Sequence, residues 1–181
     1  GSAPRWPELP LQYPDFADWE QERFGAPDAP ALEPALHYWR QALQDVPALL
    51  DLPLDGTRGA ARPAGATVRR ELPDTVSKEL ERVARERGAT PFMAFLAVFF
   101  AVLHRWSGLD DLVVTVPVSK RSRPELAPLI GLLVDTLPMR LACTPATTYN
   151  ALLDNVQHVF RDGMRHRDAP FQRIVQAIDI E

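Results

Sequence analysis

The chain has 181 residues, of which 46% are hydrophobic and 24% are charged, and its formal net charge at pH 7 is −4. This length allows one sizeable core, and the acidic balance with scattered lysines and arginines argues against a nucleic-acid partner. The single cysteine excludes an internal disulfide, and no basic and apolar leader or membrane-spanning stretch is evident, so we expect a cytoplasmic protein.

The first helix is expected soon after a proline-rich beginning. Residues 1–12 are interpreted as a tag scar and a lead segment. Tyr13–Phe24 then has the composition of a short helix, and Asp15 is well placed to cap its N-terminus. Phe16 and Trp19 are three residues apart and therefore share one face of this helix.

A second helix is predicted over Leu32–Val46, where apolar residues recur at three- and four-residue spacing. The residues that this spacing turns toward a core are Leu36, Trp39 and Leu43. Pro47–Gly65 contains three glycines but has neither a phosphate-binding nor a dinucleotide-binding spacing, so it is interpreted as a plain loop.

The next two elements are predicted from their patterns of polar and apolar residues. Alternation favours a strand over Ala66–Leu72. Pro73–Arg87 reads as an amphipathic helix that Gly88 is expected to end. The residues of this helix that we expect to face inward are Val76, Leu80 and Val83.

The centre of the chain is a long apolar helix followed by an apolar strand. Thr90 is a plausible N-cap with Pro91 at the first helical position, and Gly108 marks the end of the helix. No residue of Phe92–Leu103 is charged or strongly polar, which favours a helix buried on all sides. Leu112–Val118 is rich in β-branched residues and predicts a strand buried on both faces, so an α/β or α+β layer structure is expected.

Ser119–Arg123 is a polar, basic loop at the C-terminal end of that strand. Loops in this position often bind ligands in α/β proteins, and the alternative is a solvated loop without a ligand. Tyr149–Met164 is a further amphipathic helix, and a last helix is predicted from Phe171. The four histidines have no metal-ligand spacing and no Gly-x-Ser-x-Gly elbow is present, so neither a metal site nor a hydrolase triad is predicted.

Ile130–Leu141 predicts another apolar strand, interrupted by an aspartate. A carboxylate among apolar neighbours costs free energy unless it is paired or faces a cavity, so Asp135 is the best candidate for a site residue on physical grounds. The alternative is a bend in which Asp135 faces solvent. The cations that we expect near a buried Asp135 are Arg121 and Arg140.

Three stretches, in this order, resemble motifs of the condensation domains of nonribosomal peptide synthetases. Tyr13–Trp19 is similar to the Tyr-x-Asp-Phe-Ala-x-Trp motif of that family. Ile130–Arg140 is similar to its Ile-Gly-x-Phe-Val-Asn-Thr-x-x-x-Arg motif, and His166–Gln172 to its His-Gln-Asp-x-Pro-Phe-Glu motif. The residues that carry these matches, and that we expect to be motif or structural residues, are Tyr13, Asp15, Trp19, Arg140, His166, Asp168 and Phe171.

The resemblance implies a chloramphenicol-acetyltransferase-like α/β lobe with a central mixed sheet covered by helices. The parent domain would be an acyltransferase that forms an amide bond between two substrates held as phosphopantetheine thioesters on carrier domains, with no cofactor bound directly. The catalytic His-His-x-x-x-Asp-Gly motif of the family has no counterpart here. Residues 13–181 are therefore expected to form a second lobe that is incomplete at its C-terminus, lacks catalytic residues and is inactive alone. Its expected partners are the missing N-terminal lobe, carrier domains and further copies of itself.

Two residues depart from the family motifs. Asp135 stands where the family has Asn and adds a negative charge, and Arg167 stands where the family has Gln and adds a cation beside Asp168. The candidate side chains for a substrate channel are Asp135 and Thr136 from the second motif and Ser119 and Arg121 from the polar loop after the strand. Two alternatives stay open, a non-catalytic docking or self-association module and a fragment of an epimerisation or heterocyclisation domain.

Overall fold

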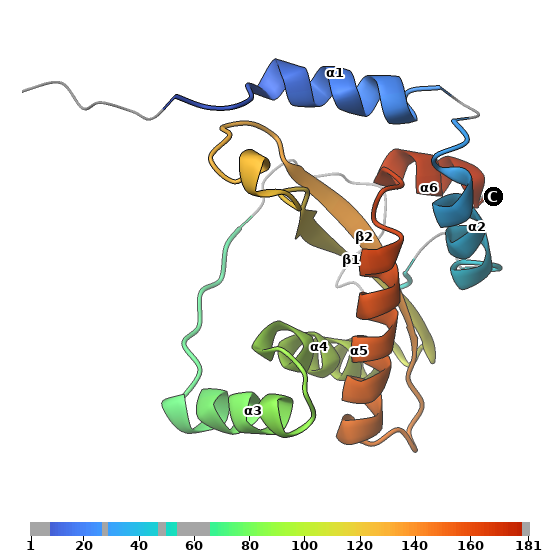
Figure 1. Cartoon of the computed structure of the whole chain (residues 1–181). Coiled ribbons are helices and arrows are strands. Elements are labelled where there is room, and N and C mark those ends of the chain that lie inside the picture. Colours follow the sequence, from blue (N-terminus) through green and yellow to red (C-terminus); the bar gives the residue numbers. More distant parts are fainter. Residues whose placement is uncertain (1–7, 27–28, 47–49, 54–65, 179–181) are drawn as a thin grey trace, which may run out of the picture. The chain divides into compact units, whose positions relative to one another are not determined.

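The computed structural model of the chain describes residues 8–26, 29–46, 50–53 and 66–178 (Figure 1). Its helices are α1 Tyr13–Phe24, α2 Glu33–Ala42, α3 Asp74–Glu86, α4 Pro91–Ser107, the 3-10 helix η1 Pro124–Leu126, α5 Tyr149–Arg165 and α6 Phe171–Ala177. Its strands are β1 Asp111–Ser119 and β2 Val134–Ala142, which pair with each other. The predicted loop Pro47–Gly65 falls mostly outside the described residues.

The chain divides into two compact units. Unit 1 comprises the described residues of Gly1–Val46, Thr115–Pro138 and Gly163–Glu181, and unit 2 those of Pro47–Val114 and Met139–Asp162. Each strand therefore has one part in each unit. A backbone hydrogen bond from Lys120 N–H to the Leu133 carbonyl (2.9 Å) and another from Cys143 N–H to the Asp110 carbonyl (2.7 Å) make the pairing antiparallel.

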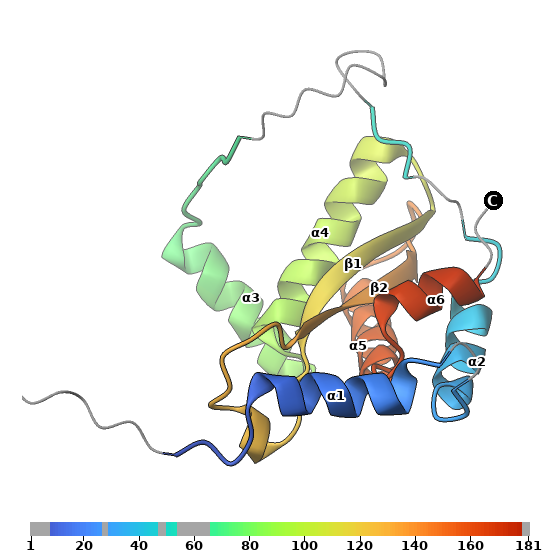
Figure 2. The same cartoon turned by 90° about the horizontal axis from the view of Figure 1, so that it is seen from above.

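Unit 1 is built around Trp39 of α2, whose side chain is only 1% exposed. The Trp39 indole Nε1–H donates to the His166 carbonyl (3.0 Å), and the His166 ring stacks on Tyr38 with centroids 4.1 Å apart. Gly163 lets the indole approach, because a Cβ there would lie 3.3 Å from Trp39 Cη2. These contacts hold α2 beside α6 in both views of the chain (Figures 1 and 2).

A second apolar cluster of unit 1 lies under α1. Its buried members are Phe16, Leu126, Leu129 and Leu133, and Leu9 and Tyr13 pack against them. Figure 2 shows α1 running past the short helix η1 that supplies Leu126. The first motif of the sequence thus packs against the segment that leads into the second.

The start of α1 differs from the prediction in one detail. Gln12, not Asp15, is the N-cap, and Asp15 occupies the third helical position. From there the Asp15 carboxylate accepts the backbone N–H of Gln12 (2.8 Å), as in a capping box. Asp15 therefore stabilises the helix start as expected, but from inside the helix.

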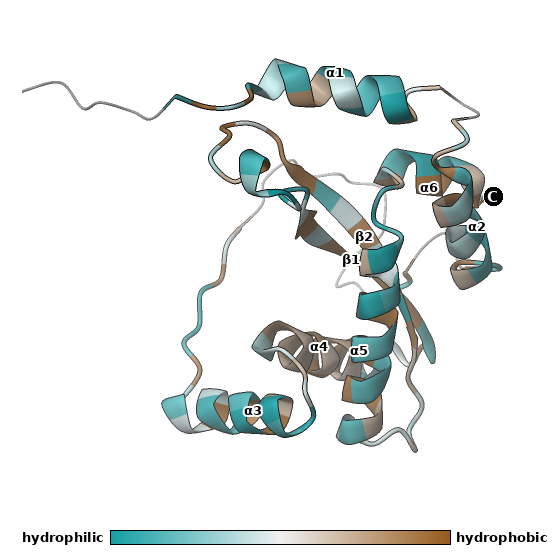
Figure 3. Cartoon of the chain, in the orientation of Figure 1, coloured by the Kyte–Doolittle hydropathy of each residue, from teal (hydrophilic) through white to brown (hydrophobic). Residues whose placement is uncertain are grey.

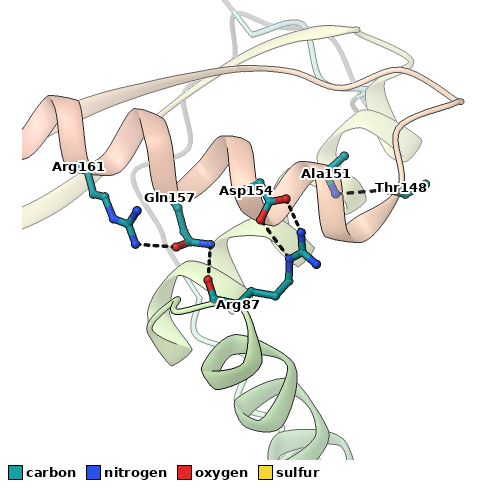
Figure 4. Close-up of polar contacts among 6 residues, drawn as sticks. All are labelled: Arg87, Thr148, Ala151, Asp154, Gln157 and Arg161. Atoms are coloured by element: carbon teal, nitrogen blue, oxygen red, sulfur yellow. Dashed lines mark hydrogen bonds and ion pairs between the residues drawn. The ribbon is translucent and has the colours of Figure 1, made fainter.

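In unit 2, α3 packs against α4, and side chains of α5 bind the turn that joins these two helices (Figure 4). Gly88 has a left-handed φ of 63°, and the N–H groups after α3 return to the Ala84 and Arg85 carbonyls (2.8 and 3.1 Å), which ends the helix as predicted. The Gln157 amide donates to the Arg87 carbonyl (3.3 Å), and Arg161 donates to the Gly88 carbonyl (3.2 Å). The turn carbonyls are thus satisfied by α5 side chains.

Further polar contacts at the same place fix the ends of these elements. The Arg87 guanidinium pairs with the Asp154 carboxylate, with Nε 3.0 Å from Oδ1. The Thr148 hydroxyl accepts the backbone N–H of Ala151 (3.3 Å) where α5 begins. The buried residues that complete this unit include Phe100, Leu103, Leu112, Met139, Leu141, Leu152, Leu153 and Val156.

Helix α4 has the predicted limits, with the Thr90 hydroxyl accepting Met93 N–H (3.3 Å) and Gly108 at a φ of 72°. The expectation that it is buried on all sides was wrong. One face is buried, whereas another carries large apolar side chains that are 37–58% exposed. We call this exposed row the α4 stripe; it consists of Phe92, Phe95, Phe99, Val102 and Trp106. Figure 3 shows that α4 is apolar along its length, whereas α3 is mostly hydrophilic.

Other predictions failed where a segment lacks a covering neighbour. Ala66–Leu72 forms no strand, and Val68 is 78% exposed, because no described strand lies beside it to pair with its backbone. Val76 of α3 is also exposed, although Leu80 and Val83 are half-buried. Strand β1 alternates between buried and exposed residues, so it is not buried on both faces.

The remaining element limits shift by a few residues. The second helix is shorter than predicted, although its inward residues Leu36, Trp39 and Leu43 are buried. The second strand begins at Val134, four residues later than predicted. Among the described helices none is by itself both long and apolar enough to cross a membrane; α3 and α4, bent by 109°, meet the length and composition criteria only together.

The packing of unit 1 predicts that Trp39→Phe is costly. The substitution leaves the part-buried His166 carbonyl without its donor and opens a small cavity, so the free energy of unfolding should fall by about 2 to 4 kcal/mol. Urea unfolding measures this loss. Trp106→Phe on the exposed α4 stripe is the matched control and should change the free energy by no more than about 0.5 kcal/mol. Equal losses in both variants would contradict the central role of Trp39.

Candidate functional site

Unit 1 contains a cavity of about 290 Å³, which we call the unit 1 pocket. It lies among α1, the segment after β1, the start of β2 and the turn before α6. Its apolar wall consists of Leu11, Phe16, Trp19, Phe24, Val118 and Leu126. Its polar lining consists of Asp15, Glu20, Ser119, Lys120, Ser122, Arg123, Glu125, Asp135, Arg167 and Asp168.

Aromatic rings from α1 form the apolar wall. The Trp19 ring is 5.9 Å from that of Phe16 and 5.8 Å from that of Phe24, the latter edge to face. The Arg123 guanidinium lies 5.7 Å from the centre of the Trp19 ring, which is a cation–π distance. The predicted common face of Phe16 and Trp19 is confirmed, and it faces this cavity.

Lys120 is the electrostatic centre of the pocket. Its ammonium lies 2.5 Å from the Glu20 carboxylate of α1 and 3.2 Å from the Asp135 carboxylate of β2. The three side chains are 22%, 30% and 15% exposed, respectively. Burial opposes the charged form of Lys120, but the hydrogen bond to Glu20 and the charge of Asp135 outweigh it and raise the pKa of the ammonium.

Asp135 connects the start of β2 to the start of α6. One carboxylate oxygen accepts the backbone N–H of Thr136 (2.7 Å) and, at a longer 3.4 Å, that of Phe171, the first residue of α6. The other oxygen contacts Lys120. The alternative in which Asp135 sits on a solvent-facing bend is therefore wrong, since the side chain is largely buried and paired.

The expected cations near Asp135 were also wrong. Arg121 turns away and donates to the Leu129 carbonyl (3.0 Å). Arg140 binds Asp111 on the paired strand, with Nη2 2.7 Å from Oδ2 and Nε 3.0 Å from Oδ1. Lys120 takes the place of both because the backbone bond from its N–H to the Leu133 carbonyl brings it opposite the start of β2.

The structure brings some of the residues selected from sequence together and separates others. Those that line the pocket are Ser119, Asp135, Asp15, Trp19 and Asp168. Those outside its lining are Thr136, Arg121, Tyr13, Arg140, His166 and Phe171. Sequence reasoning missed Glu20 and Lys120. Glu20 could have been found, since it follows Phe16 by four residues and therefore shares its helix face.

The side chains that line the pocket are better suited to binding a ligand by shape and charge than to acting as a catalytic base. Five carboxylates and three cations line it, and no histidine does. His166 packs on Tyr38, and His104 Nδ1 lies 2.9 Å from the Leu109 carbonyl. Among the residues that the structure describes, no group of three or more His, Cys, Asp or Glu side chains could hold a metal ion. A ligand with an apolar group next to a positive charge would fit this lining best, because the wall is apolar and the carboxylates outnumber the cations.

Comparison with known proteins places these features in a family. The condensation domain model matches residues 2–181. The chain is 42% identical over 170 residues to phosphinothricin tripeptide synthetase PhsC of Streptomyces viridochromogenes, covering 93% of this chain and 15% of that protein. It is 34% identical over 171 residues to malpinin synthetase of Mortierella alpina, covering 94% of this chain and 2% of that protein. The chain thus spans a small part of these relatives.

Solved structures share the fold. The X-domain in the complex of the X-domain and OxyB from teicoplanin biosynthesis superposes with a TM-score of 0.87 at 25% identity, over 100% of this chain and 40% of that one. A four-domain nonribosomal peptide synthetase, holo-AB3403, gives a TM-score of 0.76 at 28% identity, over 80% of this chain and 11% of that one. Sequence motifs, α/β fold and relatives therefore agree, and the chain belongs to the condensation-domain family of nonribosomal peptide synthetases.

Proposed function

We propose that residues 13–181 form most of the second lobe of a condensation domain, preceded by a lead segment in residues 1–12. The parent domain joins a carrier-bound acyl or peptidyl donor to a carrier-bound aminoacyl acceptor through an amide bond. The observation that carries this proposal is the convergence of all three sequence motifs on the unit 1 pocket. They contribute, in order, Asp15 with Trp19, Asp135, and Asp168.

The chemistry of amide formation defines what the chain can and cannot supply. The acceptor amine attacks the donor thioester carbonyl, the C–N bond forms, the C–S bond breaks and the amine loses a proton. A group within hydrogen-bond reach of the amine must position it or take that proton. No histidine lines the unit 1 pocket and the sequence contains no His-His-x-x-x-Asp-Gly motif, so in this proposal the catalytic group belongs to a part of the domain outside this chain. The pocket would bind and orient one substrate.

The aromatic wall and the excess of carboxylates suit the acceptor side of this reaction. An aminoacyl group has an apolar or polar side chain and an amine that is protonated before reaction, and carboxylates favour that cation. The phosphopantetheine arms of carrier domains would deliver the substrates, so no cofactor needs a site in this chain. In this proposal Ser119, Arg121, Asp135 and Thr136 belong to the substrate channel or its supporting shell.

The proposed partners follow from exposed apolar surface. The α4 stripe of unit 2 leaves five large apolar side chains in water, and in unit 1 Ile130 and Leu132 are 91% and 73% exposed. Exposed large apolar side chains of this kind, in each unit by itself, favour an interaction site. The chain covers 40% of the X-domain structure that it matches along its whole length. We propose that the remainder of the domain covers these surfaces.

A docking module is the second candidate function. The solved relative that matches the whole chain at a TM-score of 0.87 is an X-domain in complex with OxyB. A condensation-type fold can therefore serve as a binding partner of another protein. In this candidate the same exposed apolar residues would bind a separate protein, and the parent would make no amide. An epimerisation or heterocyclisation domain has no observation of its own in its favour.

The isolated chain should form no amide bond. With both carrier-bound substrates supplied, product should stay at background, because no histidine lines the unit 1 pocket to position the amine or take its proton. Mass spectrometry of the carrier-bound product measures this. The parent condensation domain is the positive control and should give product. Amide formation by the isolated chain would contradict its assignment as a lobe without the catalytic group. A parent protein that forms no amide but binds a separate protein would favour the docking module.

The isolated chain should also self-associate through the α4 stripe. Exposed apolar side chains on one helix face promote pairing, so light scattering should show dimers or larger species that dissociate in Phe99→Glu. The loss of one buried aromatic contact should weaken association about tenfold or more. Arg105→Glu adds the same carboxylate beside the stripe and should have little effect. A monomeric wild-type chain at high concentration would contradict this prediction.

A further inference from the structure

We propose that Lys120 is a positioning residue of the unit 1 pocket, which holds the Asp135 carboxylate in the pocket wall and ties α1 to the sheet through Glu20. This inference rests on the proposed function, because it assigns Lys120 a part in the binding of the substrate. It goes beyond the motif comparison, since Lys120 lies in none of the three motifs. Neither of the arginines that the sequence suggested for this purpose reaches Asp135.

The geometry makes Lys120 the only described cation that links these elements. Its ammonium contacts Glu20 from α1 and Asp135 from β2, at 2.5 and 3.2 Å, and its backbone N–H binds the Leu133 carbonyl. Among the described residues, no ion pair joins the other pocket cations, Arg123 and Arg167, to either carboxylate. Arg123 lies over the Trp19 ring instead. The position of both carboxylates therefore depends on one ammonium.

Partial burial makes the two ion pairs of Lys120 stronger than ion pairs at the surface. Exposed ion pairs contribute little because water competes with them, but the three groups here are 15–30% exposed. Removal of one partner from a desolvated pair leaves the other charge uncompensated. Loss of the Lys120 ammonium would leave two carboxylates facing the same space without their paired cation. They would separate, which would move α1 and its aromatic wall away from the sheet.

Asp135 carries the effect to the rest of the pocket. Its second oxygen accepts the N–H groups of Thr136 and Phe171, so its position sets how the start of α6 meets β2. The turn before α6 supplies Arg167 and Asp168 to the pocket lining. Asn at this position would keep an oxygen for those N–H groups but would turn a neutral amide toward the ammonium. The Lys120 cation and the Asp135 anion are thus matched to each other.

A double-mutant cycle in the parent synthetase tests the proposal. Lys120→Met, Asp135→Asn and the double variant are compared, with carrier domains loaded from a mixture of the proteinogenic amino acids and the carrier-bound product read by mass spectrometry. Lys120→Met should lower kcat/KM for the aminoacyl acceptor by about tenfold or more, mainly through KM, and Asp135→Asn by less. The double variant should recover part of this loss, because no unpaired charge remains at Asp135, whereas Glu20 stays without its cation. Lys120→Arg keeps the cation and should retain most of the activity.

Thermal unfolding of this chain separates positioning from simple stabilisation. Lys120→Met should lower Tm by about 5 °C, and the double variant should regain part of that loss. The Glu33–Arg40 pair of α2 is the matched control, since it belongs to the same unit, is exposed and does not line the pocket. Arg40→Met should change neither kcat/KM nor, by more than about 2 °C, the Tm.

Three outcomes overturn the inference. Additive losses in the cycle would show that Lys120 and Asp135 do not act together. Coupling in Tm without any change in KM would leave Lys120 a structural residue only. Failure of Lys120→Arg to retain activity would show that the cation is not what matters. Absence of product from the unmutated parent would instead overturn the proposed function, and it is seen before any variant is compared.

Discussion

A single ammonium group organises the part of the molecule that can bind a ligand. Lys120 pairs with two carboxylates that are far apart in sequence, Glu20 on α1 and Asp135 on β2, in surroundings where water competes poorly. Because each carboxylate would repel the other without the cation, Lys120 favours the approach of the two elements that carry them. The Lys120–Glu20 pair also helps to keep the aromatic wall of α1 facing the pocket. Ion pairs and the apolar cluster around Phe16 together hold this side of unit 1.

Elsewhere, each of the two units contains the same kind of contact within itself. In each, a side chain donates a hydrogen bond to a backbone carbonyl at a turn. In unit 1 the Trp39 indole donates to the His166 carbonyl, and in unit 2 Gln157 and Arg161 donate to the carbonyls of Arg87 and Gly88 (Figure 4). Each contact fixes the place where one helix ends and the chain turns toward the next. Each of these hydrogen bonds contributes about 0.5 to 1.5 kcal/mol, and together they limit the movement of the turns.

The exposed apolar residues connect the structure with its family. Helix α4 has the composition of a core helix, yet five of its large side chains are in water. Condensation-domain relatives are longer than this chain, and the X-domain that superposes on all of it extends well beyond the matched part. A helix of this composition fits a lobe that other parts of a domain cover. The same surface would also serve a module that binds a separate protein.

The sequence by itself determined the family, the helices and much of the core. Thr90 and Gly108 limit α4 as predicted, because caps depend on residue type and local backbone geometry. Ala66–Leu72 has a strand pattern but no partner, and a strand exists only where another chain segment pairs with it. The cation beside Asp135 was likewise decided by strand register, which places Lys120 within reach and turns Arg140 to Asp111. Local signals fix what a residue can do, whereas pairing across the sheet decides which residues meet, because the free energy of an ion pair depends on distance and burial that no local pattern encodes.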